Sequence, residues 1–180
     1  MGLTARLKQG ETLADRVMKV DHAGEHGAIC VYTTQLWIAR WRAPEMVHEL
    51  GHFLEHERQH RAIFAAQLDA RNKPRCRSYH LCGIGGAVLG LVTGLMGGAA
   101  IAATTVAIER VVLRHLEEQF AGLKHQDCDA AAALQSIIAD EQEHHDASHA
   151  RIGKRSVTVR VIDGIVSAST EAVIWLGMRL

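Results

Sequence analysis

The chain has 180 residues, of which 48% are hydrophobic and 22% charged, so it should fold around a sizeable core rather than stay disordered. Its 20 Lys and Arg balance its 20 Asp and Glu, and this zero net charge argues against the basic surface that nucleic-acid binding requires. The four cysteines show no Cys-x-x-Cys spacing, which argues against a thiolate zinc site.

The predicted elements are all helices, because apolar residues recur at helical spacing and the chain has only two prolines. In chain order they are a helical hairpin over about residues 12–71, a crossover over about 72–98, a second hairpin over about 99–152 and a last apolar helix over about 157–180. We therefore expect a single all-α domain that spans residues 1–180.

An uncharged run extends from Leu81 to Ile108 and is long enough to cross a bilayer. Glycines recur every four residues within it, on one side of a helix, where they permit close packing; they are Gly86, Gly90, Gly94 and Gly98. A tightly packed core helix is the alternative. The segment Asn72–Ser78 is too short to cross the length of the bundle. One straight helix from Leu81 to Leu123 would therefore not let the second hairpin close, so we expect a break near Gly97 and Gly98.

Basic clusters precede both apolar segments, and this pattern predicts peripheral attachment to an anionic lipid surface. They are Arg71, Lys73, Arg75 and Arg77 before the first, and Lys154, Arg155 and Arg160 around the start of the second. We expect the membrane-facing surface, and an entrance for an apolar substrate, near Leu81–Ala99 and Val157–Leu180, with Leu89, Leu91 and Leu95 on that surface.

Glu-x-x-His places a carboxylate and an imidazole one turn apart, where both can reach one metal ion. The pattern occurs at Glu45/His48, Glu49/His52, Glu57/His60 and Glu141/His144. Only the last two belong to a longer internal repeat, Glu-x31-Glu-x-x-His, which begins at Glu25 and again at Glu109. We call the constant offset that takes Glu25, Glu57 and His60 to Glu109, Glu141 and His144 the repeat shift.

The spacing also has a geometric meaning, because residues that face each other across a helical hairpin lie equally far from its turn. The midpoint between Glu25 and Glu57 falls beside Pro44, and that between Glu109 and Glu141 falls at His125 in a polar segment. Four Glu and two His from four helices match the di-iron or di-manganese site of ferritin-like bundles. A solvated or salt-bridged set is the alternative.

At these residues the sequence resembles the demethoxyubiquinone hydroxylase family, di-iron monooxygenases of ubiquinone biosynthesis. The matching segments are Val20–Glu25, the Glu57/His60 pair, Thr105–Glu109, Glu141–Asp146 and the terminal apolar helix. The resemblance agrees with a ferritin-like four-helix bundle that carries a hydrophobic crossover helix and an additional C-terminal helix. It implies iron ligands at Glu25, Glu57, His60, Glu109, Glu141 and His144.

The resemblance further implies two Fe ions per subunit, a reduced nicotinamide such as NADH as the external reductant, and O2-dependent hydroxylation of a membrane-dissolved polyprenyl quinone. It implies attachment to the cytoplasmic face of the inner (plasma) membrane in a bacterium, or to the matrix face of the mitochondrial inner membrane for a processed eukaryotic chain. A homo-oligomer or a complex with other proteins of ubiquinone biosynthesis is also expected.

Two departures from the family pattern concern residues outside the six. The family more usually has Tyr where this chain has His26, and a His-Tyr pair associated with electron delivery in some members is His115-Leu116 here. A ferritin-like ferroxidase or peroxide scavenger would use the same six ligands and is the alternative function. A non-enzymatic helical membrane or interaction protein is a third.

The remaining polar residues give weaker signals. Asp140, His145 and Asp146 either orient the ligands or form an exposed cluster, and His22 is expected to face inward. Four further histidines are expected at the surface; they are His48, His52, His56 and His149.

Overall fold

The computed structural model describes residues 5–153 and 156–180, and this part contains six α-helices, one 3₁₀ turn and no strand. The elements are α1 (Leu13–Arg42), the 3₁₀ turn η1 (Pro44–Met46), α2 (Val47–Ala70), α3 (Tyr79–Met96), α4 (Gly98–Leu123), α5 (Cys128–Arg151) and α6 (Val157–Gly177). The prediction of an all-α, ferritin-like bundle is confirmed. Lys154 and Arg155, from the second basic cluster, lie outside the described residues.

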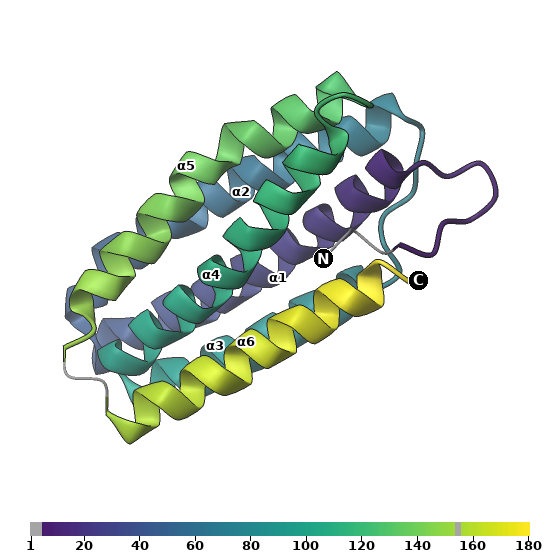
Figure 1. Ribbon diagram of the computed structural model, residues 1–180. Coiled ribbons are helices and arrows are strands. Elements are labelled where there is room, and N and C mark those ends of the chain that lie inside the picture. The colour runs from purple at the N-terminus through teal and green to yellow at the C-terminus, as the bar shows by residue number, and fades with distance from the viewer. Residues whose placement is uncertain (1–4, 154–155) are drawn as a thin grey trace.

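Four helices, α1, α2, α4 and α5, form the bundle as two hairpins, α1 with α2 and α4 with α5 (Figure 1). The two hairpins meet with α2 and α5 antiparallel. His56 contacts His144 at 3.1 Å, and one turn later on α2 His60 contacts Asp140, one turn earlier on α5, also at 3.1 Å. This register brings the middle of each helix to the centre of the bundle.

Side-chain caps fix where two of the bundle helices begin. Thr12 caps α1 by accepting from the backbone N–H of Asp15, whose carboxylate accepts in turn from the Thr12 N–H. Asp127 caps α5 by accepting from the Ala130 N–H at 3.0 Å. The caps thereby fix the residue at which each of these two helices begins.

The uncharged run forms two helices, α3 and α4, which are separated at Gly97. Its φ of 95° lies in the left-handed region that favours glycine, and the residue ends α3 and precedes α4. The chain therefore turns here. α3 packs mainly on α1 and α6 mainly on α4, both on the side of the bundle away from α2 and α5 (Figure 1).

The glycine stripe of α3 faces α1 at very short range. A Cβ on Gly90 would lie 2.5 Å from the carbonyl oxygen of Val31, and one on Gly86 would overlap the carbonyl oxygen of Gly27. A Cβ on Gly94 would lie 3.1 Å from the side chain of Ile38, which is a tight contact with a side chain rather than with backbone. The regular spacing of these glycines thus allows α3 to approach the backbone of α1, as small-residue helix contacts do.

The opposite face of α3 and one face of α6 are apolar and exposed to solvent. The residues are Leu81, Ile84, Val88, Leu91, Val92, Leu95 and Met96 on α3, and Val157, Val161, Ile165 and Trp175 on α6. Within the described part of the chain, α3 is the one helix that is long and apolar enough to span a membrane, and 39% of that stretch is buried. An exposed apolar surface of this size is typical of a protein or membrane contact.

The close approach of α3 to α1 predicts opposite effects for two neighbouring glycines. Gly86→Ala should lower the free energy of unfolding by about 1–3 kcal/mol, because its methyl group meets backbone that cannot move away. Gly85→Ala should raise it by up to about 1 kcal/mol, because its Cβ meets nothing within 4 Å and alanine favours the helix. Denaturant unfolding measures both, and equal stability of the two variants would contradict this packing.

Candidate metal centre

The structure brings all six predicted residues together in the centre of the bundle. They form two overlapping groups whose ligand atoms all lie within 4.8 Å of one another: Glu25, Glu57, His60 and Glu141 in the first, and Glu57, Glu109, Glu141 and His144 in the second. Every one of the six side chains is buried, with 6% exposure at most. A buried set of carboxylates and imidazoles could hold metal ions.

The two groups are related by the internal repeat. Glu25, Glu57 and His60 of the first hairpin become Glu109, Glu141 and His144 of the second under the repeat shift. Each group is completed by one carboxylate from the other hairpin, Glu141 in the first and Glu57 in the second. These two carboxylates belong to both groups, so they lie where a ligand shared by two metal ions would lie.

The outer nitrogen of each histidine has a partner on the facing helix. His60 Nε2 lies 3.1 Å from Asp140 Oδ2, and His144 Nε2 lies 3.1 Å from His56 Nδ1. His56 and Asp140 are themselves related by the repeat shift, so the repeat extends to the residues that orient the imidazoles. Such partners fix the ring position and leave the other nitrogen free to bind a metal.

The inner nitrogens point at carboxylates. His60 Nδ1 lies 3.0 Å from Glu141 Oε1, and His144 Nδ1 lies 3.4 Å from Glu57 Oε1. Both Nδ1 atoms, with Glu57 Oε1 and Glu141 Oε2, are buried and lack a partner of hydrogen-bond geometry. Buried polar atoms are rarely left unpaired, and four that converge on one point fit a site for cations.

Burial and mutual repulsion make three of the carboxylates unfavourable as anions. Burial, with the neighbouring charges of Glu57 and Glu141, raises the pKa of Glu25 well above its usual value. Burial raises the pKa of Glu57 and of Glu109 in the same way, and the Glu141 charge adds to both. Metal ions would offset this repulsion, since they supply the missing positive charge.

Glu141 and His60 form the opposite case. Burial favours the neutral form of Glu141, but contacts with the rings of His144 and His60 outweigh it and lower the pKa of this carboxyl. For His60 burial would lower the pKa, but the contact with Glu141 and the charge of Glu25 raise it to about 9. Without metal, an imidazolium thus balances part of the negative charge.

Tyr32 is a neighbour of the centre that the sequence reasoning did not identify. Its hydroxyl donates a hydrogen bond of 2.5 Å to Glu109 Oε1, and the side chain is fully buried. Burial and the charge of Glu109 raise the pKa of this phenol well above its usual value, so it stays a donor. The available signal was its position two turns after Glu25, on the same face of α1.

The other polar residues divide between the centre and the surface. The expectation that His56 lies at the surface is wrong, because α2 turns it towards His144. His22 is buried as expected, but it stacks on Tyr79 rather than reaching the centre. His145 contacts Asp146 at 2.9 Å on the surface, so this pair does not orient the ligands. His48, His52 and His149 are exposed as expected.

Neither of the two Glu-x-x-His pairs outside the repeat belongs to the two overlapping groups of candidate metal ligands. We call these the metal-competent groups. Glu45 is exposed, and Glu49 forms an ion pair of 2.6 Å with Arg151 near the end of α5. The repeat therefore distinguishes the two pairs that converge from the two that do not.

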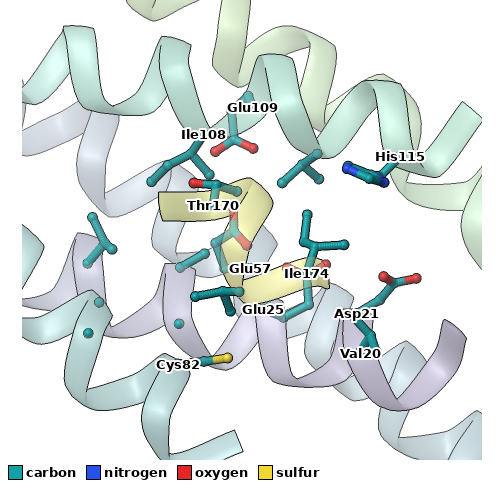
Figure 2. Close-up of a pocket in the computed structure, with 18 of the residues that line it drawn as sticks. Val20, Asp21, Glu25, Glu57, Cys82, Ile108, Glu109, His115, Thr170 and Ile174 are labelled. Carbon is teal, nitrogen blue, oxygen red and sulfur yellow. The ribbon is translucent and has the colours of Figure 1, made fainter. Parts of the chain in front are cut away.

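A cavity of about 230 Å³ lies between α1, α3, α4 and α6 and reaches the centre (Figure 2). Four of the six candidate ligands contribute to its wall, namely Glu25, Glu57, Glu109 and Glu141. Most of the remaining lining is apolar. Leu89, which was expected on the membrane-facing surface, is half-buried and lines this cavity instead, because it lies on the inner side of α3.

A family model described as "Ubiquinone biosynthesis protein COQ7" matches residues 12–177. The chain belongs to this family. It is 32% identical over 171 residues to the 3-demethoxyubiquinol 3-hydroxylase of Rhodospirillum rubrum, covering 93% of this chain and 79% of that protein. It is 30% identical over 181 residues to a mitochondrial NADPH-dependent 3-demethoxyubiquinone 3-hydroxylase of Dictyostelium discoideum, with 93% and 78% covered.

The two departures from the COQ7 family pattern both lie outside the metal-competent groups. His26 stacks on Tyr79 with a ring separation of 4.0 Å, at the contact of α1 with α3. His115 lines the cavity and its Nε2 lies 2.9 Å from Glu171 Oε2 on α6, while Leu116 lines the cavity beside it. Neither departure changes the six converging side chains.

The pKa shifts predict that the metal-free protein loses stability as the pH rises from about 6.5 to 9. The raised pKa of His60 stabilises the fold below 6.5, and this contribution disappears as the pH passes through about 9. Glu25, Glu57 and Glu109, whose pKa values are also raised, act in the same direction.

We expect the melting temperature of chelator-treated protein to fall by roughly 5 °C across this range. The fall should be smaller with metal bound, because a bound cation favours the carboxylate forms at every pH in the range. Scanning calorimetry with and without metal measures both. A metal-free melting temperature that increases with pH would show that these groups are not buried together.

Proposed function

We propose that the protein is an O2-dependent di-iron monooxygenase that hydroxylates the ring of a demethoxyubiquinol-type polyprenyl quinol. One observation carries the proposal: two symmetric groups of Glu and His share two carboxylates, and the same carboxylates form the wall of an apolar cavity. The hydroxylase names of the relatives in the COQ7 family support the same reaction.

The donor set supports iron as the metal and two ions per subunit. Four carboxylates and two imidazoles suit iron or manganese better than zinc, whose sites usually have fewer carboxylates or contain Cys. Glu25, Glu57, His60, Glu109, Glu141 and His144 would hold the two ions. Iron bound there would supply the redox chemistry with O2.

The chain's own contribution is to hold the ring beside the metal centre and to keep bulk water away. Ile108, Val112 and Leu116 on α4 line the cavity next to Glu109, and Val173 on α6 lines it as well. These side chains match an apolar substrate. Tyr32 does not line the cavity, and its hydroxyl group donates a hydrogen bond to Oε1 of Glu109.

The reaction balances with the quinol as the source of two electrons. One atom of O2 enters a ring carbon as a hydroxyl group and the other leaves as water, while the quinol becomes a quinone. A reduced nicotinamide such as NADH would then supply the electrons that restore the quinol. The Dictyostelium relative's name specifies NADPH, which is the same class of reductant.

A ferritin-like ferroxidase or peroxide scavenger is the second candidate, because it would use the same six side chains. The apolar cavity between α1, α3, α4 and α6 favours the hydroxylase, since neither the oxidation of iron nor the reduction of peroxide requires an organic binding site.

The test is to reduce the iron-loaded protein anaerobically, add a short-chain demethoxyquinol with O2, and identify the product by mass spectrometry. We expect a hydroxylated quinone that is heavier than the matching demethoxyquinone by one oxygen atom. Glu57→Ala should lose most of the iron and the product, whereas Glu49→Ala, from a non-repeating pair, should keep both. Iron mineral without an organic product would favour the ferroxidase.

We further propose that the exposed faces of α3 and α6 attach the protein peripherally to a membrane that contains the quinone. In a bacterium this is the cytoplasmic face of the inner membrane, and in a processed eukaryotic chain the matrix face of the mitochondrial inner membrane. The names of several eukaryotic relatives, such as that of Dictyostelium, describe them as mitochondrial. A homo-oligomer and complexes with other proteins of ubiquinone biosynthesis also stay predictions.

The basic cluster before α3 contributes only in part to this attachment. Arg71 pairs with Asp127 at 2.6 Å and Lys73 with Asp15 at 2.9 Å, so both serve the fold. Arg75 and Arg77 are exposed at the start of α3, where they could attract anionic headgroups.

Leu91 and Leu95, which are 42% and 51% exposed, provide the test of this surface. Leu91→Glu and Leu95→Glu should each weaken flotation with anionic liposomes and slow quinone turnover, because a charge must then leave water, while iron content stays unchanged. Ala132→Glu, on the exposed side of α5, adds the same charge elsewhere and should change neither. Flotation that is unaltered in both leucine variants would exclude this face.

A further inference from the structure

The cavity has a polar end that the metal centre does not account for. Apart from the carboxylates of the centre, its lining contains five polar side chains, from Asp21, His115, Gln119, Ser169 and Thr170. The hydroxyl groups of Ser169 and Thr170 donate to a backbone carbonyl of their own helix, and His115 pairs with a carboxylate of α6. In Figure 2, Asp21 and His115 both lie to one side of Glu57 and Glu109.

Asp21 and Gln119 form a pair across α1 and α4 that is only half satisfied. Gln119 Nε2 donates to Asp21 Oδ1 at 3.1 Å, and the Gln119 side chain is 1% exposed. The second carboxylate oxygen, Asp21 Oδ2, and the amide oxygen, Gln119 Oε1, are buried and have no hydrogen-bond partner. Two residues of the cavity wall therefore each hold a buried acceptor to which the described part of the protein offers no donor.

The internal repeat supplies a comparison for Gln119. The repeat shift relates it to Gln35, which is also fully buried and whose amide nitrogen donates to Thr93 Oγ1 at 2.8 Å. Gln35 does not line the cavity, and its partner is a hydroxyl group rather than a carboxylate. What distinguishes Gln119 is thus its acidic partner and its place in the cavity wall.

The distance between this pair and the metal centre suits the size of a substrate ring. Asp21 precedes Glu25 by about one turn of α1, which places both on one face with a rise of about 6 Å between them. Both side chains line the cavity. A six-membered ring with one oxygen substituent fits between two such positions, so an oxygen held at Asp21 brings ring carbons beside Glu25.

Given the proposed function, we propose that Asp21 and Gln119 bind a hydroxyl group of the reduced ring and so select the quinol over the quinone. The hydroxyl group donates to Asp21 Oδ2 or Gln119 Oε1, the two atoms without a partner. A quinone offers only carbonyl oxygens, which are acceptors and cannot donate to either atom. The two residues thereby act as positioning and specificity residues rather than as metal ligands.

This selection requires the ionised form of Asp21, because a protonated carboxyl group could donate to a quinone carbonyl. Burial raises the pKa of Asp21 to about 7, although the hydrogen bond from Gln119 opposes the rise. A buried carboxylate with one unpaired oxygen is unfavourable, and a hydroxyl donor from the ligand removes that cost.

The experiment compares the affinities of the anaerobic, iron-loaded protein for a short-chain demethoxyquinol and the matching demethoxyquinone, by equilibrium dialysis. We expect the native protein to bind the quinol more tightly. Asp21→Asn, which replaces a charged acceptor by a neutral amide of the same shape, should lower quinol affinity about tenfold or more. It should leave quinone affinity no weaker and iron content unchanged.

Gln119→Met and Gln35→Met form a matched pair, because both remove a buried amide at repeat-related positions. Only Gln119→Met should reduce the ratio of quinol to quinone affinity. If the ratio is native in iron-loaded Asp21→Asn and Gln119→Met, the inference is wrong, even where the native protein hydroxylates the quinol. If the native protein makes no hydroxylated product, the proposed function fails, and the affinity ratios report the subsite separately.

Discussion

The enclosure of four carboxylates in one helical core is the constraint on which the rest of the structure depends. Glu25, Glu57, Glu109 and Glu141 are each almost completely buried, and burial alone disfavours their charged forms. Two imidazoles balance only part of this charge. Cations at the centre would offset this charge, while long helices hold each of these side chains in register and a largely apolar wall borders them.

The internal repeat places the same three residue types in each half of the centre. The two halves differ in one neighbouring residue. Tyr32 donates to Glu109, but the repeat shift places Leu116 at the corresponding position beside the other half of the site. The Leu116 side chain has no donor and lines the cavity together with Glu25. Both Glu25 and Glu109 line the cavity, but only Glu109 has a tyrosine hydroxyl as a hydrogen-bond donor.

The sequence predicted the helical class and the break near Gly97 from local patterns, and it predicted the six converging side chains from the internal repeat. It missed other side-chain contacts between helices. His56 was expected at the surface because it lies among exposed histidines, yet its repeat-related residue is Asp140, and that polar match was a signal. Leu89 was misplaced because the glycine stripe shows which side of α3 meets α1 but not where the cavity lies.

The two helices that wall the cavity on its outer side, α3 and α6, are attached to the bundle by different interactions. α3 meets α1 through glycines in backbone contact, where there is no room for sliding. α6 is held at its end by the buried Arg16, which donates to the Gly177 carbonyl at 3.0 Å. Beside the cavity its polar links include two partly exposed pairs, Arg110 with Asp163 and Arg114 with Glu171, and such pairs contribute about 0–1 kcal/mol each. The wall formed by α6 is therefore the easier one to displace, and in the proposed membrane-bound state it borders the lipid from which a quinol would enter.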